Sequence, residues 1–112
     1  IMVNDQIYEQ VKDLVEARQL DLIQVMGKEE PVVAYEILER KGELSEDMMQ
    51  VVEHYNKGMK AYWDYDFTTA KTFFESAIEI VPEDGPSALY ADRCEEFILN
   101  PPEDLVFRAD SK

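Results

Sequence analysis

The sequence predicts an α+β fold in two parts, a short strand–helix–hairpin unit followed by an all-α unit. Residues 17–38 hold two short apolar runs separated by the turn-forming stretch Gly27–Pro31, which is typical of a β-hairpin. Beyond residue 48 the apolar residues recur every three or four positions, which is the period of an α-helix. The polar stretch 39–47, which contains Gly42, lies between these two patterns, and we interpret it as a linker.

The first unit, residues 1–38, is expected to begin with the end of a strand at residues 1–3. Asn4 follows as a candidate N-cap, because its side-chain oxygen can accept a hydrogen bond from the first turn of the helix after it. The period of two in the second hairpin strand indicates one apolar face. The residues expected on the apolar face of the helix are Ile7, Val11 and Leu14, and those expected on the face of the strand are Val33, Tyr35 and Ile37.

The second unit, residues 48–100, carries three apolar stripes that predict three helices. Ser45 is a candidate N-cap for the first helix, Pro82 ends the second, and Pro86 begins the third. The tail, residues 101–112, has little periodicity. The three stripes are Met48, Val52, Tyr55, Met59 and Tyr62; Phe67, Ala70, Phe74, Ala77 and Val81; and Leu89, Tyr90, Cys94 and Phe97.

Acidic residues dominate the charge of the chain. It has 25 Asp and Glu residues against 11 Lys and Arg, a formal net charge of −14, which disfavours nucleic acid and an anionic membrane surface as partners. Cys94 is the single cysteine, so no intrachain disulfide can form, and its place on an apolar stripe predicts buried packing. His54 is the single histidine, and the acidic residues have no recognisable metal-ligand spacing, so we expect no metal site.

The spacing of small and aromatic residues in the helical unit resembles that of a tetratricopeptide repeat, which is a pair of antiparallel helices. The resemblance covers residues 51–84, and residues 86–98 resemble the first helix of a following repeat that serves as a cap. It implies that small residues let the two helices approach closely, that an aromatic ring fills the space between them, and that a proline stops the second helix. The residues in these positions are Gly58, Ala70, Phe74, Ala77 and Pro82.

The segments "IMVNDQIYEQVKDL" and "LDLIQVMGKEEPVVAYEIL" are similar to the end of the class III adenylate and guanylate cyclase catalytic domain. That family closes with a strand, a helix and a hairpin whose turn typically reads Val-Lys-Gly-Lys. Here the turn reads Val-Met-Gly-Lys, and a Pro-Val pair and a Tyr-Glu pair follow it as they do in the family. The segment "DGPSALYADRCEEFILNPPED" also resembles the end of many bacterial cyclases that carry a repeat after the catalytic domain.

The cyclase resemblance implies a nucleotide-binding role for Lys28, because an ammonium on a short turn can meet the oxygens of a triphosphate. Met26 stands where the family has its first turn lysine, and the alternative for Lys28 is a solvated turn residue. The family's other catalytic groups are an Asn–Arg pair and two carboxylates that hold Mg or Mn ions. They would lie upstream of Ile1, so the resemblance implies no catalytic residue and no cofactor in this segment.

Two hypotheses for the function follow. In the first, the chain is the C-terminal fragment of a class III cyclase that makes cyclic AMP or cyclic GMP from ATP or GTP for signal transduction. The fragment itself is then non-catalytic, and its helices serve interaction or dimerisation. In the second, the chain is a free-standing interaction module with no cyclase parent. A third hypothesis is a small enzyme built on Lys28 or Cys94.

Either of the first two hypotheses calls for a partner. An isolated hairpin exposes a strand edge and an apolar face, so we expect a protein partner or a homodimer formed through the strands or the helices. No apolar run of the sequence approaches the ~20 residues that a membrane span needs. We therefore expect a cytoplasmic location, or the cytoplasmic side of a membrane-anchored parent.

Overall fold

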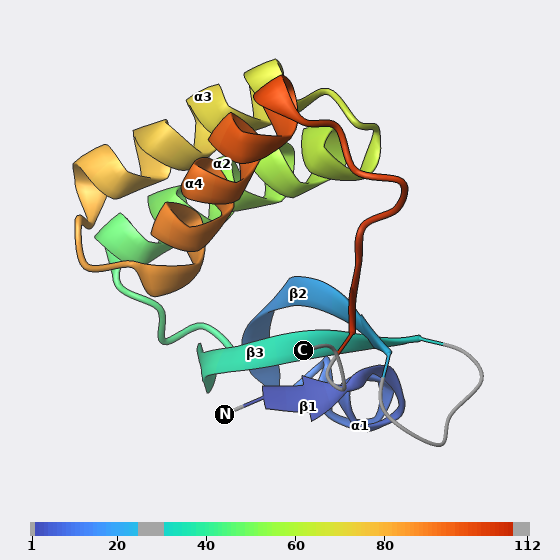
Figure 1. Cartoon of the computed structure of the whole chain (residues 1–112). Helices are drawn as coiled ribbons and strands as arrows, with labels where there is room; N and C mark the ends of the chain where they lie inside the picture. The colour runs from blue at the N-terminus through green and yellow to red at the C-terminus, as the bar shows by residue number, and fades with distance from the viewer. Residues whose placement is uncertain (1, 25–30, 109–112) are drawn as a thin grey trace. The chain divides into compact units, whose positions relative to one another are not determined.

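A computed structural model describes residues 2–24 and 31–108 of the chain (Figure 1). The predicted α+β class is confirmed. The chain divides into two compact units. The first unit consists of residues 1–44 together with residues 104–112, and the second consists of residues 45–103.

The first unit is a four-stranded sheet in the order β1-β3-β2-β4. Strands β2 and β3 pair antiparallel, which confirms the predicted hairpin, although residues 25–30 of its turn lie outside the described residues. Strand β1 pairs antiparallel with β3, and β4 runs parallel to β2. The strands are β1 (Met2–Asn4), β2 (Val15–Gln24), β3 (Val32–Arg40) and β4 (Val106–Arg108).

Strand β4 comes from the tail, in which no strand was predicted. It pairs with the last three residues of β2 and so forms the edge strand of the sheet on that side. Three residues are too few to display a period of two, so only the tertiary pairing identifies this strand.

Helix α1 (Asp5–Val11) begins where the sequence predicts, since Oδ1 of Asn4 accepts a hydrogen bond from the amide of Ile7 at 2.9 Å. The predicted apolar face is wrong, because the helix ends at Val11 and both Ile7 and Leu14 are exposed. A helix of two turns contacts the sheet through one ring instead. Tyr8 stacks on Tyr35 of β3 with their ring centroids 4.1 Å apart.

The second unit contains the three predicted helices. They are α2 (Glu46–Trp63), α3 (Phe67–Ile80) and α4 (Gly85–Leu99). Ser45 caps α2, as predicted, by accepting a hydrogen bond from the amide of Met48 at 3.1 Å. Asp84 caps α4, and Pro86 lies in its first turn as predicted. Three residues join α2 to α3, and among them Tyr65 has a φ of 63°.

The core of the helical unit corrects parts of the predicted stripes. In α2 the buried valine is Val51, whereas Met48 and Val52 are only half-buried, because the stripe that includes residues 51, 55, 58 and 62 faces the other helices. In α4, Leu89 is exposed, and the buried face contains Tyr90 and Cys94. The stripe of α3 is confirmed at Phe67, Ala70, Phe74 and Ala77, while Val81 lies half-buried beyond the helix end.

Helices α2 and α3 are in close contact at Gly58. A Cβ atom built on this residue would lie 2.8 Å from Cε1 of Phe74, a separation at which a side chain or the backbone must shift. Since Phe74 is itself completely buried, its ring has little space to move into. The distance between the two helices is therefore set by the absence of a side chain at Gly58.

We expect Gly58→Ala to destabilise the helical unit by roughly 1–3 kcal/mol, because overpacking outweighs the better helix propensity of alanine. The measurement is the loss of the circular dichroism signal at 222 nm in a urea titration. Gly85→Ala is the matched control, since a Cβ atom there meets nothing within 4 Å. An equal midpoint for the two variants would contradict the packing role of Gly58.

Candidate functional site

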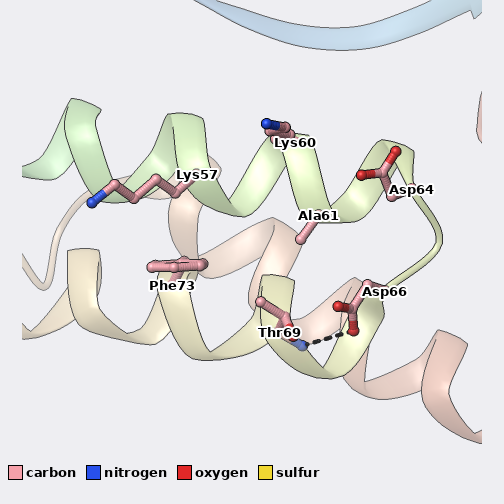
Figure 2. Close-up of a pocket in the computed structure, with 7 residues that line it drawn as sticks. All are labelled: Lys57, Lys60, Ala61, Asp64, Asp66, Thr69 and Phe73. Carbon is pink, nitrogen blue, oxygen red and sulfur yellow. Dashed lines mark hydrogen bonds between the residues drawn. The ribbon is translucent and has the colours of Figure 1, made fainter.

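A shallow groove of about 290 Å³ lies between α2 and α3 (Figure 2). On α2 and its C-cap, the lining residues 57, 60, 61 and 64 lie on the side of the helix that does not carry Tyr55 and Tyr62. Its α3 residues come from the first half of that helix and from its cap. The groove is lined by Lys57, Lys60, Ala61, Asp64, Asp66, Thr69 and Phe73.

The charges of the groove are separated along its length. Figure 2 shows Lys57 and Lys60 on one part of α2, and Asp64 and Asp66 together at the end where α2 turns into α3. Lys57, at the positive end, already has partners within the chain. Its Nζ lies 3.6 Å from Glu53 and 6.0 Å from the ring centroid of Phe73. This pattern suits a ligand that offers negative charge at one end.

The centre of the groove is apolar. Ala61 points between the two helices, and the half-buried ring of Phe73 projects from α3 below Lys57 (Figure 2). Asp66 already has a structural role, since its Oδ1 accepts a hydrogen bond from the amide of Thr69 at 3.3 Å as the cap of α3. The lining contains no nucleophile paired with a base. The groove offers charged and apolar contacts that suit a segment of a protein chain. We assign it no reaction.

A second hollow lies in the sheet of the first unit. It has a volume of about 210 Å³ and is almost entirely apolar. Its lining comes from three strands, β1, β2 and β3, at residues Met2, Val3, Asn4, Ile23, Val32, Val33 and Ala34. On β2 and β3, Nε of the buried Arg18 lies 2.9 Å from Oε1 of Glu36, its partner in the strand pairing.

The predicted site residues lie in different environments in the structure. Lys28, the candidate for a triphosphate contact, lies outside the described residues. Pro82 lies in an exposed turn that follows the end of α3. The other four residues of the predicted repeat are all buried in the helical unit, and they are Gly58, Ala70, Phe74 and Ala77.

The groove itself was not predicted from the sequence. Its lysines and Asp64 were part of the polar surface of α2, and Phe73 stood one position before a residue of the apolar stripe. The signal that could have identified the groove is the pair Lys57 and Lys60 in an acidic chain, on a helix face that also carries Ala61. The shape of the groove depends on how the side chains of α2 and α3 pack against each other, and the spacing of residues along one helix does not specify that packing.

Cys94 is completely buried in α4. Burial raises the pKa of its thiol from 9.0 to about 11, since the charged thiolate would lose its hydration. The folded chain therefore keeps the proton up to about pH 11, while the unfolded chain releases it near 9.0, so the contribution of Cys94 to stability falls as the pH rises between these values. This environment is the reverse of the one that activates a catalytic cysteine.

His54 has Nδ1 buried without a hydrogen-bond partner. Within residues 2–24 and 31–108, no group of three or more histidine, cysteine, aspartate or glutamate side chains could hold a metal ion. Of the helices that the structure describes, none is long and apolar enough to cross a membrane.

Comparison with known proteins gives one informative match. Over 78 residues the chain is 32% identical to a protein named "Adenylate cyclase, terminal-differentiation specific" from Dictyostelium discoideum. The match covers 69% of this chain but only 4% of that much longer protein. No protein-family model matches the chain, and no solved structure matches it. A region of the chain is thus related in sequence to part of an adenylate cyclase.

Because the match is long relative to the chain, some residues must lie inside it wherever it begins. With 69% of 112 residues covered, about 35 residues lie outside the match, so residues 36–77 lie inside it wherever it begins. These residues contain the end of β3, all of α2 and most of α3. The similarity therefore extends across both units of the chain.

We expect the thiol of Cys94 to react with a small alkylating reagent at pH 8 about a hundredfold more slowly in the folded chain than in urea. The reason is that a pKa near 11 in place of 9.0 leaves correspondingly less thiolate. Mass spectrometry of the alkylated chain over time measures the rate. Equal rates in the folded and unfolded chains would contradict the burial of this thiol and would favour a reactive cysteine.

Proposed function

We propose that this chain is the C-terminal, non-catalytic segment of a class III nucleotide cyclase, followed by a helical unit that mediates interaction or self-association. The observation that carries the proposal is the match to an adenylate cyclase across residues 36–77. Wherever the match begins, it includes the end of β3, all of α2 and most of α3, which supports a common origin for this junction. A chance likeness of one hairpin or of one helix would not extend over this junction.

The order of elements in the first unit supports the cyclase part of the proposal. Strand β1, helix α1 and the hairpin of β2 and β3 follow one another as they do at the end of the cyclase catalytic domain. In the proposal Lys28, on the turn of this hairpin, reaches the triphosphate in the complete enzyme. The carboxylates that hold Mg or Mn and the Asn–Arg pair belong to the part of the parent upstream of Ile1.

The geometry of the helical unit supports a tetratricopeptide-like repeat. Helices α2 and α3 form a hairpin in which Gly58 meets Phe74 at close range, as the small and aromatic positions of the repeat require. Helix α4 packs against α3 and fits the role of a capping helix from a following repeat. Its partner in the proposal is a protein, either another chain or a second copy, and the location is cytoplasmic.

A second candidate function is a free-standing interaction module with no cyclase parent. The observation in its favour is that residues 45–103 form a compact unit with its own core. The two candidates differ in what precedes Ile1 in the coding sequence. The cyclase proposal requires a Gly-Asp motif and an Asn-plus-Arg motif there, and the module does not.

We expect the purified 112-residue chain to form no cyclic AMP or cyclic GMP from ATP or GTP, with Mg or Mn present. The physical reason is that cyclisation needs two metal ions to neutralise the triphosphate and to activate the 3′-hydroxyl. Product is measured by mass spectrometry, with a complete class III cyclase as the positive control. Turnover above the level of the buffer would refute the non-catalytic assignment, and a coding sequence without the two upstream motifs would refute the cyclase parent.

A further inference from the structure

Helix α4 presents an outward face that nothing in the described chain covers fully. Leu89, Asp92, Glu96 and Leu99 are spaced by three, four and three positions, so they share one side of the helix. All four are exposed, with Leu89 at 50% and Leu99 at 75% of full accessibility. The opposite side of α4 holds Tyr90, Ala91 and Cys94 in the core. We call the four exposed residues the α4 face.

The groove between α2 and α3 is complementary to this face in charge and in polarity. The α4 face has two acids between two leucines, and the groove has Lys57 and Lys60 beside the apolar surface of Ala61 and Phe73. The side chain of Lys57 is 55% exposed. The groove is thus a place where an otherwise acidic chain offers accessible positive charge.

Two further cations of the helical unit tie its helices together, whereas Lys57 pairs with Glu53 on its own helix. Lys71 lies 3.7 Å from Glu75 and 3.4 Å from Glu95, which ties α3 to α4. Nη1 of Arg93 donates a hydrogen bond to the hydroxyl of Tyr62 at 3.2 Å. An acidic surface that approaches the helical unit therefore finds its best complement at Lys57 and Lys60.

The spacing of the charges on the two helices also matches. Lys57 and Lys60 are separated by a rise of about 4.5 Å along α2, and Asp92 and Glu96 by about 6 Å along α4. An antiparallel arrangement brings Glu96 to Lys57 and Asp92 to Lys60.

We propose that copies of this chain stack head to tail, with the α4 face of one copy lying in the α2–α3 groove of the next. This inference rests on the proposed function of the helical unit as an interaction module, and it names the partner as a second copy of the chain. Because each copy contributes two different surfaces, the contact is heterologous and is not limited to two copies.

Charge reversal on either surface tests the proposal in the complete 112-residue chain. One variant carries Lys57→Glu and Lys60→Glu, and the other carries Asp92→Lys and Glu96→Lys. Sedimentation velocity is measured up to about 500 μM, where an association with a Kd of about 100 μM is visible. We expect the wild-type chain to associate with rising concentration, and each variant alone to associate at least about tenfold more weakly, because like charges then face each other.

The equimolar mixture of the two variants is the decisive sample. The glutamate groove of one variant now meets the lysine α4 face of the other, and the unchanged lysine groove of the second meets the unchanged acidic α4 face of the first. Both contacts between unlike copies are therefore complementary, and only contacts between like copies remain repulsive. We expect the mixture to recover the association of the wild type with rising concentration, in stacks in which the two variants alternate. The control matched to the α2 variant carries Lys12→Glu and Lys41→Glu in the first unit, which lowers the net charge by the same amount, and it should associate like the wild type.

Three results would overturn the proposal. They are a wild-type chain that stays monomeric throughout, variants that associate as strongly as the wild type, and an effect of reversal on α2 without one on α4. The third result would mean that the groove takes a different acidic segment. None of these results bears on cyclic nucleotide formation or on the upstream motifs, so a failure here is distinguishable from a failure of the proposed function.

Discussion

The contact between Gly58 and Phe74 is the constraint on which the helical unit depends. It lets α2 and α3 approach closely enough for the buried ring of Phe74 to meet two further rings, Tyr55 at 5.6 Å and Tyr90 at 5.6 Å between centroids. Since Tyr90 belongs to α4, this aromatic cluster also fixes the third helix. The face that α4 turns outward, and the groove left on the other side of α2, both follow from this packing.

The first unit is held together differently. Most of its described strand residues are only half-buried, and its fully buried side chains are few, with Arg18 and Ala34 among them. Strand pairing, the stacked rings of Tyr8 and Tyr35, and the ion pair of Arg18 with Glu36 supply its order. A sheet with an apolar hollow and a modest core is what one expects of an element that completes a larger domain, which agrees with the proposed origin in a cyclase.

Local chemistry made much of the fold predictable from the sequence. The caps at Asn4 and Ser45 and the proline at the start of α4 act within one helical turn, so the residues themselves specify the element ends. What failed depended on distant partners. Val51 is buried in place of Val52 because the positions of α3 and α4 decide which side of α2 faces inward, and β4 exists only through its pairing with β2. The groove at Lys57 was missed for the same reason.

The net charge of the chain also affects how copies of it can contact one another. Copies with a net charge of −14 repel one another at a distance, so any contact between them must place opposite charges close together to overcome that repulsion. Exposed ion pairs contribute only about 0.2–1 kcal/mol each, so Lys57 and Lys60 would define the register of such a contact while Leu89, Leu99 and Phe73 supply its burial. The lysines of the groove would thus favour a face with apolar residues beside its acids, because the net charge of −14 opposes contacts in which acids face acids.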